Sequence, residues 1–181
     1  MSRIPQITND NASEEQQQLF SAIQQKLGMI PNILRVFAHS TDALQAFLGL
    51  HHITEQGALS AATRERIALA LAQKNKCEYC LSAHTAMGRK SGLNTEEIEA
   101  NRAGDSQDAK AAVAVKFARS LLDNMGEVTS NELLEMRKAG FSEAEIVEVI
   151  THTGMNILTN MLGKASRVEI DFPRVDLQLA A

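Results

Sequence analysis

Two cysteines and one histidine carry the clearest chemical signal in this sequence. The chain has only two cysteines, and they lie three residues apart as Cys77 and Cys80, with His84 four residues further on. If this segment begins a helix, both sulfur atoms lie on its first turn and can form a disulfide with little backbone movement. Backbone N–H groups and the helix dipole at that end favour a thiolate, the nucleophile of peroxide and disulfide chemistry. Lys76 adds a positive charge beside the pair. The pattern predicts a redox-active dithiol.

His84 and Glu65 are candidates for moving the proton that this chemistry requires. His84 follows Cys77 by seven residues and Cys80 by four, so the three side chains share one face of a helix. An imidazole there can take the proton from Cys80 or give one to a leaving alkoxide. Glu65 lies in an otherwise apolar helical segment, and we expect its carboxylate to be partly buried. From the residues alone, however, the preferred interpretation of Glu65 is a first-turn acid that interacts with the helix dipole.

Other interpretations of these residues stay open on the sequence. The cysteine pair could be buried as two small apolar residues, or it could bind zinc together with His84. A structural zinc site needs four protein ligands, and the chain has no second Cys-x-x-Cys pair to complete one. His51 and His52 are adjacent, so their side chains diverge by about 100° on a helix and at most one is expected to face inward. We therefore do not predict a metal site.

Helical signals run along nearly the whole chain and predict a single all-α domain, a helical bundle. Ser13, Thr129 and Ser142 each begin a capping box, and Pro31 suits the first turn of a helix. The expected helices span residues 13–28, 31–37, 40–57, 60–74, 77–92, 94–104, 108–125, from 129, and 142–163. Residues 168–170 are the only strand candidate and are too short to be predicted as one. We expect a lead-in segment at 1–15, the helical domain at 16–175 and a tail at 176–181.

The composition narrows the functional classes. Hydrophobic residues make up 44% and charged residues 22% of 181, and the net charge of −4 comes without blocks of like charge. These values indicate neither a nucleic-acid partner nor a membrane partner. The N-terminus has no signal-peptide pattern, so we expect a cytoplasmic location, where a cysteine pair is more often catalytic or metal-binding than structural. No nucleotide or flavin motif is present, and we predict no cofactor. Five methionines, Met87, Met125, Met136, Met155 and Met161, are expected to fill the core.

The pattern Glu65, eleven residues, Cys77-x-x-Cys80-x-x-x-His84 resembles the signature of the alkyl hydroperoxidase D-like (AhpD-like) branch of the carboxymuconolactone decarboxylase superfamily. The likeness continues in residues 30–35, 64–69, 83–85 and 156–172, and it covers roughly residues 20 to 175. The resemblance implies an all-helical fold that assembles into homo-oligomers, commonly trimers or hexamers built as trimers of dimers. It also implies a thiol-dependent peroxidase that reduces hydroperoxides.

In such enzymes the second cysteine attacks the peroxide and the first one resolves the sulfenic acid, so the resemblance implies that Cys80 is peroxidatic and Cys77 resolving. It makes Glu65 and His84 a proton relay, and it implies an external dithiol reductant, in this family a lipoyl-bearing protein. The superfamily's decarboxylases lack the cysteine pair, which argues against that activity. One departure is Tyr79, where the best-known members have a second histidine; a phenol with an ordinary pKa of about 10 cannot replace imidazole as a base. The alternatives are a thiol–disulfide oxidoreductase or redox sensor acting on proteins, and a non-enzymatic oligomeric module that holds zinc.

Overall fold

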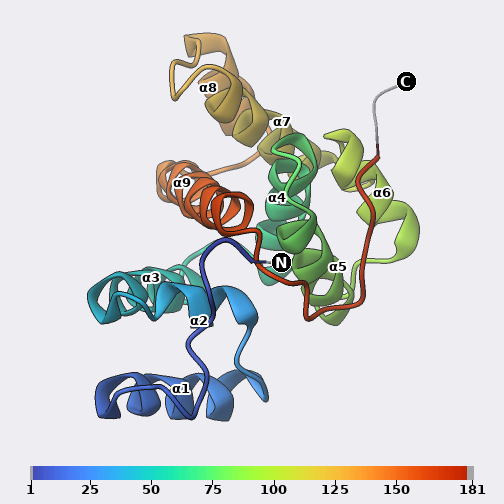
Figure 1. Cartoon of the computed structure of the whole chain (residues 1–181). Coiled ribbons are helices and arrows are strands. Elements are labelled where there is room, and N and C mark those ends of the chain that lie inside the picture. The colour runs from blue at the N-terminus through green and yellow to red at the C-terminus, as the bar shows by residue number, and fades with distance from the viewer. Residues whose placement is uncertain (1, 179–181) are drawn as a thin grey trace.

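The computed structural model describes residues 2–178, and all of the regular structure in that range is helical (Figure 1). The predicted all-α fold is confirmed, and no strand forms at residues 168–170. The helices of the described range are α1 (Glu14–Leu27), α2 (Asn32–Phe37), α3 (Thr41–Glu55), α4 (Ala61–Lys74), α5 (Glu78–Lys90), α6 (Thr95–Ala103), α7 (Ala109–Asp123), α8 (Ser130–Lys138) and α9 (Glu143–Ser166).

Side-chain caps begin several helices where the sequence predicts them. Ser13, Thr129 and Ser142 each accept the N–H of the third helical residue, whose Gln or Glu side chain accepts the N–H of the cap residue. One predicted end is wrong, because α9 continues through Gly163 and ends at Ser166; it is followed by Arg167, whose φ of 48° is left-handed. Gly163 is the residue predicted to end this helix. In the structure it lies inside α9, where the missing side chain lets the helix pack closely against the cysteine pair.

Helix α4 is the centre of the fold. It packs against α5, α6, α7 and α9, and the run Ile67–Ala72 has no exposed surface. Leu69 faces a core shared mainly with α1, α2, α3 and α5, whereas Leu71 faces a second core shared with α7, α8 and α9. Because α4 contributes to both cores, it fixes the positions of α5, which carries Cys77, Cys80 and His84, and of α9.

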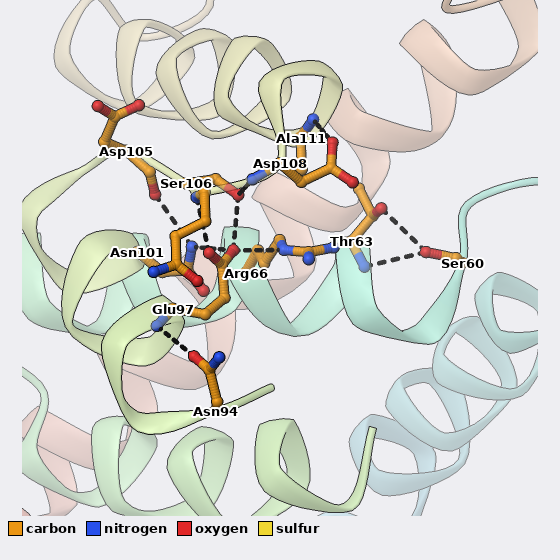
Figure 2. A network of polar contacts seen from close by, with 11 residues as sticks. Ser60, Thr63, Arg66, Asn94, Glu97, Asn101, Asp105, Ser106, Asp108 and Ala111 are labelled. Atoms are coloured by element: carbon orange, nitrogen blue, oxygen red, sulfur yellow. Dashed lines mark hydrogen bonds and ion pairs between the residues drawn. The ribbon is translucent and has the colours of Figure 1, made fainter. Parts of the chain in front are cut away.

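A polar network joins α4 to the connection between α6 and α7 (Figure 2). The carboxylate of Glu97 accepts hydrogen bonds from Arg66 Nε at 2.6 Å, Ser106 Oγ at 2.6 Å, the backbone N of Gln107 at 2.7 Å and Asn101 Nδ2 at 2.9 Å. Burial opposes ionisation of this carboxyl, but the four donors outweigh it and lower the pKa of Glu97 to about 2. The network is a structural connection between helices.

After α9, residues 167–178 follow α5 and α6 without regular structure (Figure 1). The backbone N of Val175 donates to Ser82 Oγ at 3.0 Å, and Asp171 accepts the backbone N–H of Asn32 at 2.8 Å. The predicted tail at 176–181 lies partly outside the described residues. This segment contacts α5 through Glu78, Tyr79 and Ser82.

The methionine expectation is only partly right. Met136 is fully buried and Met155 nearly so, whereas Met125 and Met161 are 91% and 65% exposed. Over residues 2–178, no helix combines the length and the apolar character needed to cross a membrane.

Candidate functional site

The cysteine pair begins α5, directly after a three-residue turn from α4. Lys76 in this turn has a φ of 55°, a left-handed conformation that non-glycine residues rarely adopt. The turn places Cys77 at the N-cap position, where its Sγ accepts the backbone N–H of Cys80 at 3.3 Å. The two cysteines are joined by a disulfide across a Cα–Cα distance of 5.3 Å. The helix start therefore brings the sulfurs together, as the spacing predicts, and aims one backbone donor at Cys77 Sγ.

His84 and Glu65 meet across the packed helices α5 and α4. The Nδ1 atom of His84 lies 2.8 Å from Oε2 of Glu65, and the two side chains are 17% and 16% exposed. A carboxylate only accepts, so Nδ1–H donates and Nε2 is left as the basic nitrogen. The expected partial burial of Glu65 is confirmed. The interpretation as a first-turn acid is wrong, because α4 begins at Ala61 and has no acidic residue in its first turn.

A cavity of about 400 Å³ lies beside the cysteine pair and is bordered by both members of this carboxylate–imidazole pair. Cys80 lines the cavity and Cys77 does not, although both are buried, with exposures of 3% and 1%. Most of the wall is apolar and comes from α1, α2, α3, α5, α9 and the C-terminal segment: Ala22, Ile23, Leu27, Pro31, Ile33, Leu34, Phe47, Leu48, Ala83, Met87, Met155 and Phe172. A molecule in the cavity would reach Cys80 first.

Tyr79 also borders the cavity, at the position between the cysteines. Its hydroxyl oxygen accepts the backbone N–H of Ile33 at 3.3 Å, and its ring packs edge-on against Phe172. Burial, and secondarily the negative charge of Asp171, raise the pKa of Tyr79 above its usual value. The phenol therefore stays protonated, and it cannot act as the base that a histidine would supply here.

Three further histidines border the cavity, although the sequence does not predict them as site residues. Both His51 and His52 border it, but only His51 is half-buried, and His52 is exposed, which agrees with the expectation that at most one faces inward. Burial lowers the pKa of His51, against the opposing charge of Glu55. His152 is buried, and its Nε2 lies 3.0 Å from the backbone oxygen of Arg64. Burial lowers the pKa of His152 to about 4, so it is neutral and donates from Nε2. No local motif marks His152, since its partner lies 88 residues away.

Helix α9 approaches the sulfur atoms closely. A Cβ atom on Gly163 would lie 3.1 Å from Cys77 Sγ and 3.6 Å from Cys80 Sγ. One turn earlier, Asn160 is 1% exposed, and its Oδ1 accepts a hydrogen bond from Asn75 Nδ2 at 2.8 Å. Lys164 donates to the backbone oxygen of Asn75 at 2.8 Å. These contacts attach α9 to the turn that precedes the cysteine pair.

The geometry gives no support to the zinc alternative. Within residues 2–178, no three His, Cys, Asp or Glu side chains converge in a way that could hold a metal ion. Cys77 faces Gly163 on α9, away from the cavity wall, whereas His84 belongs to that wall.

Comparison with known proteins relates the chain to one family and one fold. Residues 41–120 match the model of the carboxymuconolactone decarboxylase family. An uncharacterized peroxidase-related protein from Silicibacter sp. TM1040 is 28% identical, with 91% of each chain covered and a TM-score of 0.79. The alkylhydroperoxidase AhpD core of an uncharacterized peroxidase-related protein from Ralstonia eutropha JMP134 is 22% identical, with 94% of this chain and 92% of that chain covered and a TM-score of 0.85.

The same fold occurs in a protein with a different named activity. The debrominase Bmp8, solved in complex with 2,3,4-tribromopyrrole, is 16% identical over 94% of this chain and 92% of its own, with a TM-score of 0.77. At this identity the likeness concerns the fold alone, and the chemistry has to be argued from the residues in the cavity.

Proposed function

We propose that this chain, which matches the carboxymuconolactone decarboxylase family over residues 41–120 and has the AhpD-like fold, is a dithiol peroxidase that reduces organic hydroperoxides. The observation that carries the proposal is the position of Cys80 on a largely apolar cavity wall that also holds the hydrogen-bonded pair of His84 and Glu65. Over one cycle, the dithiol and ROOH give the Cys77–Cys80 disulfide, ROH and water.

In the first step the thiolate of Cys80 attacks the terminal oxygen of the hydroperoxide. The O–O bond breaks, the sulfur becomes a sulfenic acid, and RO⁻ leaves as the alcohol after it takes up a proton. His84 is one helical turn beyond Cys80 and is oriented by Glu65 through Nδ1–H. Its free Nε2 can accept the thiol proton and return it to the alkoxide, which is general acid–base catalysis by one imidazole.

In the second step Cys77 attacks the sulfenic sulfur of Cys80, water leaves, and the disulfide forms. The 5.3 Å separation of the two Cα atoms supports this step, because it suits a bonded pair. An external dithiol then reduces the disulfide by exchange. The sulfurs are buried, and the cavity borders only Cys80. A dithiol on a slender arm, such as that of a lipoyl-bearing protein, fits this access better than a cysteine on a folded surface. The same burial disfavours an oxidoreductase that acts on folded proteins.

We also propose that the chain forms a homo-oligomer, a trimer or a hexamer, as the resemblance implies. Four exposed apolar side chains of α9 support self-association, since they fall within an arc of about 80° on one face of the helix. They are Val147, Ile150, Leu158 and Met161.

The proposed reaction cycle ends when an external dithiol reduces the Cys77–Cys80 disulfide, and such a cycle suits a reducing compartment.

The direct test is a thiol count on metal-free, fully reduced protein before and after one equivalent of cumene hydroperoxide. We expect both thiols to disappear together and the intact mass to fall by two hydrogens. In Cys80→Ser the remaining thiol should survive, whereas Cys77→Ser should accumulate a sulfenic acid on Cys80 that a dimedone probe traps. Thiols that survive the peroxide in the wild-type chain would contradict the proposal and direct the search to protein disulfides.

A further inference from the structure

The side-chain amide of Asn160 contains a buried donor that has no partner in the oxidised protein. Its Oδ1 accepts from Asn75, but its Nδ2 has no hydrogen-bond partner and almost no accessible surface. Leaving such a donor unpaired costs about 1–3 kcal/mol, so buried amides usually find an acceptor. The disulfide offers only neutral, weakly accepting sulfur.

The position of Asn160 directs this donor towards the start of α5. Gly163, on the next turn of α9, faces both sulfur atoms and lies nearer to that of Cys77. The partner of Asn160, Asn75, is two residues before Cys77 in the tight turn between α4 and α5. Cys77 is 1% exposed and does not border the cavity, so no water in the cavity would solvate a charge on its sulfur.

We propose that Asn160 is a thiolate-binding residue, and that its Nδ2–H donates to the Sγ of Cys77 when the disulfide is reduced. Reduction turns that sulfur into a thiolate, an acceptor that the oxidised protein lacks. With the backbone N–H of Cys80, which already points at this Sγ, the amide supplies a second donor to the anion. Hydrogen bonds to charged groups are stronger than those between neutral groups. Asn160 thus stabilises the nucleophile of the resolving step, and it makes the disulfide easier for the external dithiol to reduce.

The experiment measures the acidity of Cys77 directly, in a Cys80→Ser background in which Cys77 is the only thiol. The ultraviolet absorbance of the thiolate is followed as a function of pH, together with the rate of alkylation by iodoacetamide. We expect Asn160→Leu to raise the pKa of Cys77 and to slow its alkylation at neutral pH about three- to tenfold. The slowing is smaller than the loss of thiolate alone would give, because the thiolate of a less acidic thiol is the stronger nucleophile. In the two-cysteine chain, the equilibrium constant for reduction by dithiothreitol should fall about tenfold or more.

Asn156→Leu is the matched control, because Asn156 is one turn earlier on α9 and buried, and its Nδ2 already donates to the backbone oxygen of His152. We expect it to leave the titration of Cys77 unchanged. Asn160→Asp is the second variant if Asn160→Leu does not fold, since it keeps the acceptor for Asn75 and replaces the donor by a carboxylate; it should raise the pKa of Cys77 further, because the lost hydrogen bond and the added negative charge act in the same direction. A titration of Cys77 that is unchanged in both Asn160 variants would overturn the inference. The role of Asn160 in the resolving step rests on the proposed dithiol peroxidase reaction. The titration of Cys77 needs no peroxide, so either proposal can fail while the other stands.

Discussion

Replacing Gly163 by alanine should test the closeness of α9 to the disulfide. An alanine Cβ at this position would lie 3.1 Å from Cys77 Sγ and 3.8 Å from Ile33 Cδ1, so the sulfur or the helix must move by a few tenths of an ångström. Overpacking of this kind costs about 1–3 kcal/mol. The same substitution gains up to about 1 kcal/mol, because alanine is the better helix former.

Gly154 separates these two effects, because it lies in the same helix and a Cβ there would meet nothing within 4 Å. Gly154→Ala should therefore stabilise the protein by up to about 1 kcal/mol. Gly163→Ala should be less stable than Gly154→Ala by about 1–3 kcal/mol, since the helix-propensity gain is common to both. Gly49→Ala in α3, also without a neighbour within 4 Å, gives a control outside α9.

The assay is urea unfolding of the oxidised proteins, followed by far-ultraviolet circular dichroism at one protein concentration, because self-association would shift the apparent stability. The comparison uses the difference in the free energy of unfolding between the two α9 variants. If Gly163→Ala stabilises the chain as much as Gly154→Ala does, then α9 does not press against the sulfurs, and the reasoning on Asn160 loses its geometric basis.

Three further substitutions test the titratable side chains Glu65, His152 and Glu97. Glu65→Gln should slow the peroxide-dependent loss of thiols by about a hundredfold, because His84 loses the carboxylate that accepts its Nδ1–H; stopped-flow thiol loss measures this. His152 has a pKa of about 4 when folded and near 6.5 when unfolded. The unfolded chain therefore binds the proton first, and stability falls as the pH drops from 6.5 to 4, by about 3 kcal/mol at most. His152→Gln should remove this part of the pH dependence in urea titrations. Glu97, with its pKa of about 2, adds stability that is present above pH 4.5 and lost as the pH falls towards 2. Glu97→Gln should cost about 3–5 kcal/mol of unfolding free energy at pH 7, because it leaves Arg66 without its charged partner.

Each of these expectations has a contrary result. Thiol loss at the wild-type rate in Glu65→Gln would mean that the carboxylate takes no part in the proton relay. A stability difference between wild type and His152→Gln that does not change between pH 4 and 6.5 would mean that the imidazole is not held neutral. A peroxide reaction that slows strongly in Glu97→Gln while the fold is intact would mean that this network does more than join helices.

Local chemistry explains the part of the structure that the sequence predicts well. The capping boxes at Ser13, Thr129 and Ser142 act within four residues, so the helices begin where the pattern says they do. Cys77 and Cys80 are likewise related by a single helical turn, and their proximity needs no tertiary contact. Their position at the start of α5 could therefore be predicted from spacing alone.

The pairing of Glu65 with His84 could not be derived in this way. The two residues are 19 apart and meet only because α4 and α5 pack side by side. Spacing favoured a helix-dipole role for Glu65, and the resemblance to a family supplied the alternative that the geometry supports. The cavity is even harder to predict from the sequence, because the residues of its wall are spread along the chain from Ala22 to Phe172.

Helix α9 shows most clearly why periodicity misses this site. Besides the apolar Ile146, Val149 and Met155, its inward face carries four polar side chains, namely His152, Thr153, Asn156 and Asn160, all of them buried. Its outward face carries the apolar side chains Val147, Ile150, Leu158 and Met161. The usual rule assigns apolar residues to the core and polar residues to solvent. Applied to the four inward polar and the four outward apolar residues of α9, it would predict that the buried polar side chains are exposed and that the exposed apolar side chains are buried.

The inversion is consistent with the two roles proposed for this helix. Buried polar groups are costly unless they find partners, so a polar inner face persists where it has something to bind. Here the partners are the backbone oxygen of Arg64 for His152 and the side chain of Asn75 for Asn160, and we infer the thiolate of Cys77 as well. The outer apolar face is the surface that the proposed homo-oligomer would cover with a second copy of the chain. A helix that buries four polar side chains opposite a Cys-x-x-Cys turn and exposes an apolar stripe on its other face is thus a signal in its own right, because both features are unfavourable unless those side chains have partners.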